Sequence, residues 1–362
     1  MTDRDGSAVM RRALELARQG WGQTAPNPMV GAVVVRDGVV VGEGFHARYG
    51  EAHAEVAALA AAGSVARGAT LYVTLEPCAH HGKTPPCADA IVAAGIARVV
   101  IATRDPHPQA AGGADRLRAA GVAVDIGDGA SEARELNAAY FHRFAHPERP
   151  FVSLKLAVSI DAAIAAADRS TTTHLTGPEA RREVHRVRAG HDAIAVGVGT
   201  VLADDPQLTV RDWAPPRTPL VRVIFDSTLR TPLDSGLVRT ARTAPVVIVA
   251  RAGEPSRARA LTAAGVEIIE ASAVSEALLR LAQRGIGSLL VEGGARLAGS
   301  FLANSVVDRL IIFQAPVLLG EGALNAFAFA PPADVARLER LPVLDRRVLG
   351  ADVMTTYALG AL

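Results

Sequence analysis

The feature that most constrains this chain is a group of four side chains between residues 51 and 90. His53 and Glu55 stand two residues apart, and Cys78 and Cys87 are the two cysteines of the chain. Imidazole nitrogen and thiolate sulfur are good zinc ligands, and three protein ligands leave a fourth tetrahedral position for water. Zinc lowers the pKa of such a water to about 7, and a carboxylate beside the metal can carry its proton. The pattern predicts a catalytic zinc site with ligands His53, Cys78 and Cys87 and with Glu55 as the proton carrier.

The segments around these side chains predict a strand between two helices. Residues 53–59 are alanine-rich and favour a helix, 69–75 form an apolar, β-branched run typical of a strand, and two prolines precede a predicted helix over 87–94. His53 and Glu55 can both reach a site beyond the N-terminus of the first helix only from its first turn. Two helix N-termini would then face one metal, and their partial positive charge favours thiolate.

The order His-x-Glu, Pro-Cys, Cys is the signature of zinc-dependent nucleobase deaminases. The longer run E-P-C-x-H-x-G-K-T-P-P-C at 76–87 separates its cysteines by eight residues, where the general signature has two. This run resembles the deaminase domain of the bifunctional deaminase–reductases of riboflavin biosynthesis. The resemblance implies a cytidine-deaminase-like fold and a set of substrate-binding residues, namely Asn27, His46, His80, Lys83 and Asp105.

Three other interpretations of these residues stay open at this point. The cysteines and His53 could form a structural zinc clip with His80 or His81 as the fourth ligand. Cys78 and Cys87 could form a disulfide, although so few cysteines indicate a reducing cytoplasm. Glu55 could be a solvated helix carboxylate.

The overall composition excludes several classes of protein. A length of 362 residues predicts two domains. A net charge of +1 and an aromatic content of 4% argue against a nucleic-acid groove, which needs basic stripes and stacking rings. The charged N-terminal segment is unlike a secretory signal, and no apolar run is long enough to span a membrane. We expect a cytoplasmic enzyme that acts on a small molecule.

Alternating strand and helix patterns predict two α/β domains, 1–147 and 148–362, joined at the polar, proline-flanked segment 146–150. The first is expected to be a three-layer α/β/α domain with a mixed sheet. Its helices are expected at 9–18, 53–59, 87–94, 115–120 and 131–144, and its strands at 30–35, 39–42, 69–75, 98–102 and 122–126. In the second domain, strands are expected at 151–158, 193–198, 221–225, 246–250, 266–270, 288–291 and 310–315, and helices at 178–189, 275–284 and 295–303.

The second domain also carries a sequence pattern for nucleotide binding. Glu292-Gly293-Gly294 follows a predicted strand and opens a predicted helix, where backbone N–H groups can hold a phosphate. Residues 199–211, Asp226-Ser227 and 291–297 resemble the reductase domain of the same bifunctional family. That resemblance implies a dihydrofolate-reductase-like fold that uses NADPH. The implied cofactor residues are Ala157, His174, Thr200, Asp204, Ser227, Gly294, Ala295, Arg296, Leu297, Ala298, Gly299 and Ser300. The implied substrate residues are Lys155, Thr172, Arg188, Leu208, Arg211 and Glu292.

The chain departs from the family pattern at four positions. His107 stands where the family usually has Asn, Ala162 and Ala163 replace a Gly and a cation, and His174 stands where a Trp is frequent. The last three lie near the expected cofactor site.

The sequence therefore predicts a bifunctional riboflavin-biosynthesis enzyme, expected as a homodimer or homotetramer. It would use Zn²⁺ to deaminate 2,5-diamino-6-ribosylamino-4(3H)-pyrimidinone 5′-phosphate, and NADPH to reduce the ribosyl group to ribityl. One alternative is a zinc deaminase of another nucleobase or nucleotide with a weak or inactive reductase domain. Another is a non-catalytic zinc module joined to a nucleotide-sensing domain, which Glu55 argues against because a structural clip needs no free carboxylate.

Overall fold

The structure, a computed structural model, describes residues 3–80, 85–168, 174–332 and 340–360. The chain divides into two compact units between Ala145 and His146. Within the described ranges, no helix combines the length and apolar character needed to cross a membrane.

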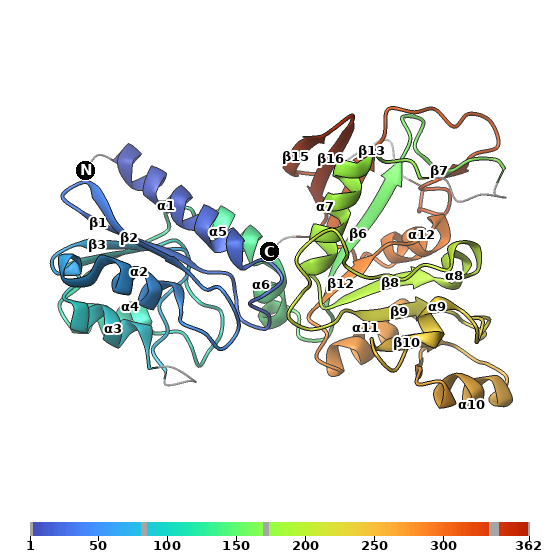
Figure 1. The fold of residues 1–362 in the computed structure, drawn as a ribbon, viewed down its shortest axis with the longest axis horizontal. Helices are drawn as coiled ribbons and strands as arrows, with labels where there is room; N and C mark the ends of the chain where they lie inside the picture. Colours follow the sequence, from blue (N-terminus) through green and yellow to red (C-terminus); the bar gives the residue numbers. More distant parts are fainter. Residues whose placement is uncertain (1–2, 81–84, 169–173, 333–339, 361–362) are drawn as a thin grey trace. The chain divides into compact units, whose positions relative to one another are not determined.

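The first unit is a five-stranded mixed sheet between two layers of helices (Figure 1). The strand order is β2-β1-β3-β4-β5; β1 pairs antiparallel with β2 and β3, and β3, β4 and β5 run parallel. The strands are β1 (Gly31–Arg36), β2 (Val39–Phe45), β3 (Thr70–Val73), β4 (Arg98–Ile101) and β5 (Ala123–Ile126). The α-helices are α1 (Asp3–Ala17), α2 (Ala54–Ala62), α3 (Cys87–Ala94), α4 (Gly113–Ala119), α5 (Ala130–Leu136) and α6 (Ala138–Ala145).

Alternation along the strands builds a hydrophobic core on each face of this sheet. Ala32 and Val34 of β1 pack into the cluster that α2, α3 and α4 cover. Val33 and Val35 point to the opposite face and pack against α1 and α5. Because successive strand residues point to opposite faces, one apolar strand contributes to both layers, and the predicted three-layer α/β/α domain is confirmed.

Two glycines of β2 allow α2 to lie close to the sheet. A Cβ atom on Gly42 or Gly44 would overlap the backbone of α2 at Ala58. Ala58 and Ala62 are buried and face this strand. The small residues on both sides therefore fix the position of α2, whose first turn carries residues of the site.

The structure divides one predicted helix of this unit in two, and it begins another, α1, at Asp3 instead of Val9. The single helix expected over 131–144 is interrupted at Asn137, which separates α5 from α6. The Asn137 side chain pairs with the backbone of Met29, accepting from its N–H at 2.8 Å and donating to its C=O at 2.9 Å. These two hydrogen bonds to a distant loop outweigh the preference of the local sequence for a continuous helix.

The second unit is built on a nine-stranded sheet, in the order β11-β10-β9-β8-β12-β6-β13-β16-β15. The strands from β11 to β13 are parallel, and β16 and β15 add an antiparallel hairpin at one edge. Its strands are β6 (Phe151–Val158), β8 (Ala193–Gly197), β9 (Val221–Phe225), β10 (Val246–Ala250), β11 (Glu267–Glu270), β12 (Ser288–Val291), β13 (Arg309–Gln314), β15 (Val343–Leu349) and β16 (Asp352–Ala358). A small separate sheet pairs β7 (Ala163–Ala165) with β14 (Leu324–Asn325).

Helices cover this large sheet over three clusters of buried apolar side chains. They are α7 (Pro178–Ala189), α8 (Val198–Asp204), α9 (Gly236–Arg239), α10 (Pro255–Ala263), α11 (Val274–Gln283) and α12 (Ala295–Ala303). All seven predicted strands and all three predicted helices are confirmed to within one or two residues. The hairpin β15–β16 was not predicted, because the edge strand β15 is mostly exposed and polar.

An ion pair fixes the start of the second unit. The Arg149 guanidinium meets the Asp308 carboxylate twice, with N–O distances of 2.7 and 2.8 Å. The same carboxylate accepts the N–H of Val152 at 2.8 Å. The segment before β6 is therefore held against the residue that precedes β13.

We expect that replacing Ala162 by glycine stabilises the second unit. Ala162 is exposed and has a φ of 58°, a left-handed conformation that costs an L-residue about 1–2 kcal/mol. Glycine avoids this cost but loses more backbone freedom on folding, worth about 0.5–1 kcal/mol. Ala162→Gly should therefore raise the free energy of unfolding by about 0.5–1 kcal/mol in urea denaturation.

Ala163→Gly is the matched control for this change. Ala163 is the next residue, lies in β7 and is buried, and its φ is not positive. Its replacement should lower the free energy of unfolding by about 1 kcal/mol. Equal destabilisation by both changes would contradict the backbone strain at Ala162.

Candidate active sites

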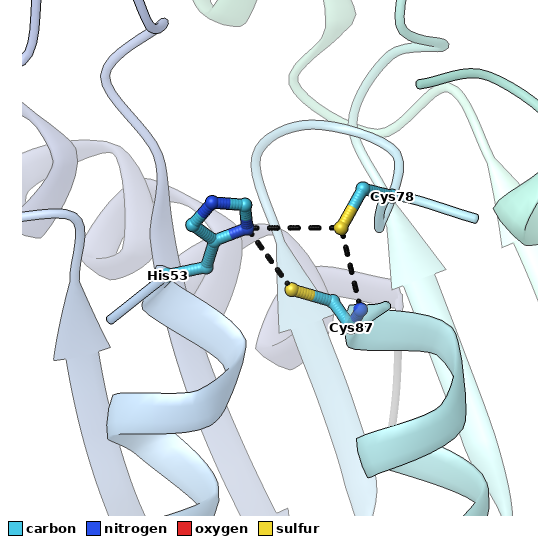
Figure 2. A group of neighbouring side chains, drawn as sticks. All are labelled: His53, Cys78 and Cys87. Atoms are coloured by element: carbon cyan, nitrogen blue, oxygen red, sulfur yellow. Dashed lines mark hydrogen bonds between the residues drawn. The ribbon is translucent and has the colours of Figure 1, made fainter. Parts of the chain in front are cut away.

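The three predicted zinc ligands converge at the N-termini of two helices. His53 is the residue that caps α2, Cys87 is the first residue of α3, and Cys78 lies in the loop that follows β3. His53 Nδ1 lies 3.2 Å from Cys87 Sγ and 3.7 Å from Cys78 Sγ. Figure 2 shows the three side chains pointing toward one another.

These separations fit a tetrahedral zinc site. Bonds of about 2.3 Å to sulfur and 2.0 Å to nitrogen place tetrahedral ligand atoms about 3.6 Å apart. The three donor atoms all lie within 4.8 Å of one another. One imidazole and two thiols also form a donor set that suits zinc better than most other common divalent metals.

The side chains of the site by themselves stabilise a thiolate. The side chain of Cys87 donates toward Cys78 and, although burial opposes the charge, this bond and His53 lower the pKa of Cys78 to about 4. The backbone N–H of Cys87 also donates to Cys78 Sγ, at 3.3 Å. The same pairing and burial raise the pKa of Cys87. One sulfur is therefore ready to bind a cation.

Glu55 lies beside these ligands without being one of them. It sits in the first turn of α2 and is only 3% exposed. Burial raises the pKa of Glu55 to about 7. A carboxyl group with this pKa can both accept and release a proton near neutral pH.

A cavity of about 280 Å³ opens onto this group. It is bordered by the predicted zinc ligands His53 and Cys78, by Glu55, and by four of the predicted substrate residues, Asn27, His46, His80 and Asp105. The fifth, Lys83, lies outside the described residues. The cavity also has lining residues that were not predicted, Pro28, Val30, Tyr49, Gly50, Glu51, Leu75, Glu76, His107, Ala110 and Tyr140.

Hydrogen bonds define the protonation of His46. Its Nδ1 lies 3.1 Å from the carbonyl of Ala52, so Nδ1 donates, and its Nε2 then accepts from the Asn27 amide at 3.3 Å. Burial lowers the pKa of His46. A neutral His46 therefore holds the Asn27 side chain at the cavity wall.

Glu76 fixes the loops that border the cavity. Its buried carboxylate accepts the N–H groups of Asp105, Gly112 and Ala114 at 3.2, 3.3 and 3.0 Å. This links the segment after β3 to the segment after β4. The sequence motif includes Glu76, but its partners lie 29 to 38 residues further along the chain, so the motif alone did not reveal this role.

In the second unit, the predicted cofactor residues gather at the carboxyl ends of neighbouring parallel strands. Thr200 and Asp204 lie in α8 after β8, Ser227 follows β9, and the segment from Gly294 to Ser300 begins α12 after β12. A Cβ atom on Gly199 or Gly294 would meet no heavy atom within 4 Å, so the starts of α8 and α12 border open space. Such helix starts fit the phosphates of a dinucleotide.

A buried group of three charges lies at the same edge of this sheet. Arg188 of α7 contacts Glu292, which follows β12, through two hydrogen bonds of 2.7 and 2.9 Å. Lys155 of β6 approaches the same carboxylate at 3.8 Å. Burial opposes the charge of Glu292, but the attraction of Arg188 and Lys155 outweighs it and holds the pKa of Glu292 at about 2. Burial lowers the pKa of Lys155.

The other predicted residues of this unit are spread over several elements. Leu208 is buried with a φ of 51°, Arg211 is exposed and donates to Gln207, and His174 is exposed. Ala157 of β6 packs against the cluster under α7. Thr172 lies outside the described residues.

Comparisons with known proteins agree with this division of the chain. Residues 3–103 match the cytidine and deoxycytidylate deaminase zinc-binding region, and residues 150–339 match the RibD C-terminal domain. The riboflavin biosynthesis protein RibD of Aquifex aeolicus is 45% identical over 316 residues, covering 86% of this chain and 87% of the relative.

Two solved structures are similar over nearly the whole chain. RibD of Acinetobacter baumannii (form 1) is 37% identical with a TM-score of 0.84, covering 98% of this chain and 99% of that one. A diaminohydroxyphosphoribosylaminopyrimidine deaminase/5-amino-6-(5-phosphoribosylamino)uracil reductase of Thermotoga maritima is 35% identical with a TM-score of 0.84 and the same coverage. The predicted combination of a cytidine-deaminase-like and a reductase fold is confirmed.

We expect Cys78→Ser to lower the zinc content of the purified protein at least about tenfold, because a ligand is lost. His80→Ala is the control, since His80 borders the cavity but is not part of the three-ligand group. Its zinc content should equal that of the wild type by atomic emission. Loss of zinc from His80→Ala would instead support a closed site with four protein ligands.

We expect the Glu292 carboxylate to make the second unit sensitive to acid. Its pKa is about 2 in the folded chain and about 4.3 in an unfolded one. Its contribution is present above the unfolded value and is lost as the pH falls toward 2, for a total of roughly 3 kcal/mol. Unfolding in urea at pH 6 and pH 3 measures the difference.

Between pH 6 and pH 3, the free energy of unfolding of Glu292→Gln should fall by about 1–2 kcal/mol less than that of the wild type. It should also destabilise the unit by about 3–5 kcal/mol at pH 6, because Arg188 and Lys155 stay buried without a counter-charge. Glu179→Gln on the exposed side of α7 is the control and should change neither quantity. An unaltered pH dependence of unfolding in Glu292→Gln would contradict Glu292 as the source of the acid sensitivity.

Proposed function

The chain belongs to the RibD family of bifunctional riboflavin-biosynthesis enzymes, and from this premise we propose which residues carry each of its two reactions. A zinc-dependent deaminase is joined to an NADPH-dependent reductase. The substrate is 2,5-diamino-6-ribosylamino-4(3H)-pyrimidinone 5′-phosphate. The alternative of a zinc deaminase with an inactive reductase domain is not favoured, since the similarity spans both units.

We propose 1–147 as the deaminase domain and 148–362 as the reductase domain, supported by the division of the structure between Ala145 and His146. In the deaminase, His53, Cys78 and Cys87 would hold zinc, which would supply a water acidic enough to attack the amino-bearing ring carbon at neutral pH. Glu55 would take a proton from the attacking water and deliver it to the departing ammonia. The ring gains a carbonyl oxygen and loses one NH₃.

The other residues that line the cavity with Glu55 bind the substrate. The Asn27 amide is oriented by neutral His46 and can bond to the pyrimidine edge. Asp105 accepts from an N–H or O–H group. His80 and Lys83 follow Cys78 in the zinc loop, where a cation suits the substrate phosphate.

In the reductase, NADPH supplies the hydride for the ribosyl group of the deaminated product. The helix starts at Gly199 and Gly294, together with the other predicted cofactor residues, hold the dinucleotide. Glu292 and Lys155 contact the ribosyl group, because they lie together at the carboxyl edge of the sheet.

The geometry divides the work of two arginines. The guanidinium of Arg188 is engaged by Glu292 and by the carbonyl of Thr209. Its proposed role is to orient Glu292 at the substrate. Arg211 is exposed and is the better candidate for the substrate phosphate. Leu208 and Thr172 complete the proposed substrate contacts.

We further propose a homodimer or homotetramer that works in the cytoplasm. The exposed apolar side chains of the edge strand β15, Val343 at 52% and Val348 at 74%, support assembly, since uncovered edges tend to pair. The free thiols Cys78 and Cys87 support a reducing compartment. Light scattering would show the molar mass, and a monomer would refute the assembly.

The test follows ammonia release and NADPH absorbance in one cuvette with zinc-loaded protein and the diaminopyrimidine phosphate. In the wild type, ammonia should appear first and NADPH should then fall. Glu55→Gln should lower the deamination kcat by about 10²–10⁴-fold, because the proton carrier is lost. It should keep its zinc and should still oxidise NADPH when the deaminated product is supplied.

Glu132→Gln, on the exposed surface of α5, is the control and should behave like the wild type in both reactions. Unchanged deamination by Glu55→Gln would refute the proton-carrier role. Ammonia release without NADPH consumption in the wild type would refute the reductase half.

A further inference from the structure

Helix α6 supplies part of the deaminase cavity that no zinc motif predicts. Tyr140 of α6 borders the cavity together with Asp105 and His107. Tyr140 and Asp105 are 35 residues apart in the chain. The last helix of the first unit therefore reaches the substrate site.

Asp105 is anchored through one of its two carboxylate oxygens. Oδ1 accepts the Tyr140 hydroxyl at 2.9 Å and the His107 backbone N–H at 2.9 Å. The backbone N–H of Asp105 donates to Glu76 at 3.2 Å. No residue in the described part of the chain donates a hydrogen bond to Oδ2, so this oxygen can accept one from a ligand in the cavity.

The Tyr140 ring is itself fixed by aromatic packing. Its centroid lies 5.2 Å from that of Phe144 with the rings at 73°, and Phe144 packs against His107 at 5.1 Å. Burial and the neighbouring Asp105 raise the pKa of Tyr140, so the phenol keeps its proton and acts as the donor. The direction of the hydroxyl is thus set by the protein before a substrate binds.

We propose that Tyr140 is a positioning residue of the deaminase, whose hydroxyl holds Asp105 so that Oδ2 accepts a hydrogen bond from the substrate. The partner is an amino or hydroxyl group, because a carboxylate repels the phosphate. This inference rests on the proposed function of the cavity. It adds α6 to the elements that determine substrate affinity.

Tyr140→Phe tests the proposal, because it keeps the ring and its packing but removes the hydroxyl. The KM for the diaminopyrimidine phosphate should rise about 3- to 10-fold, as expected for one hydrogen bond, while kcat changes little. NADPH oxidation with the deaminated product supplied directly should be unchanged, as should the zinc content. These two measurements show in the same chain that the variant is folded.

Tyr72→Phe is the matched control. Tyr72 lies on β3 and packs on the α1 side of the sheet, so the same hydroxyl is lost outside the cavity lining. Its deamination constants should equal those of the wild type. An equal rise of KM in both variants would overturn the proposal.

A double-mutant cycle separates positioning from a general structural role. Asp105→Asn removes the charged acceptor, and Tyr140→Phe should cause no further rise of KM in that background. Additive effects, an unchanged KM in Tyr140→Phe, or a parallel loss of zinc or reductase activity would each overturn the proposal. Absence of ammonia from the wild type would overturn the proposed function and this inference with it, whereas normal wild-type turnover with additive variants would overturn the inference alone.

Discussion

The close packing of α2 on β2 is the constraint on which the deaminase site depends. Gly42 and Gly44 leave no room for a side chain between the strand and the helix, so α2 cannot move without disturbing the sheet. The start of α2 presents His53 and Glu55 together, one as a proposed zinc ligand and the other as the neighbouring carboxyl group. A side chain at Gly42 would collide with α2 and move His53 away from Cys78 and Cys87. The position of the proposed metal site is therefore determined by small residues that are not part of it.

Both units place their functional groups at the carboxyl ends of parallel strands. Asp105 follows β4 in the deaminase, and Glu292 follows β12 in the reductase. Neighbouring parallel strands bring the segments that follow them to one edge of the sheet. In each unit, a buried carboxylate then joins such a segment to other parts of the chain. Glu76 does this through backbone N–H groups, whereas Glu292 does it through two cationic side chains. The group around Glu292 is more sensitive to substitution than the group around Glu76, because removing one of its partners leaves a buried charge without compensation.

The sequence predicted the parts of the site that are encoded locally. His53, Cys78 and Cys87 follow a short motif, and Gly294 stands between a predicted strand and a predicted helix. These residues therefore lie at the starts of the helices where they were expected. Asn137 and Tyr140 could not be found in this way, since each acts on a loop about 35 to 108 residues away. The break between α5 and α6 was missed for the same reason, because the clamp on Met29 is a tertiary contact that overrides local helix preference.

The departure at residues 162 and 163 illustrates the difference between a lost motif and a lost structure. The family pattern favours Gly where this chain has Ala162, yet Ala162 still adopts the left-handed conformation. Asp161 secures the turn, because its carboxylate accepts the N–H groups of Leu319 and Gly320 at 3.2 and 2.8 Å. A hydrogen bond from the Ser159 side chain, together with these two backbone bonds, lowers the pKa of Asp161 to about 2. The substitution therefore acts on the energy of the turn, and the backbone path beside the reductase sheet is kept by hydrogen bonds that do not depend on the glycine.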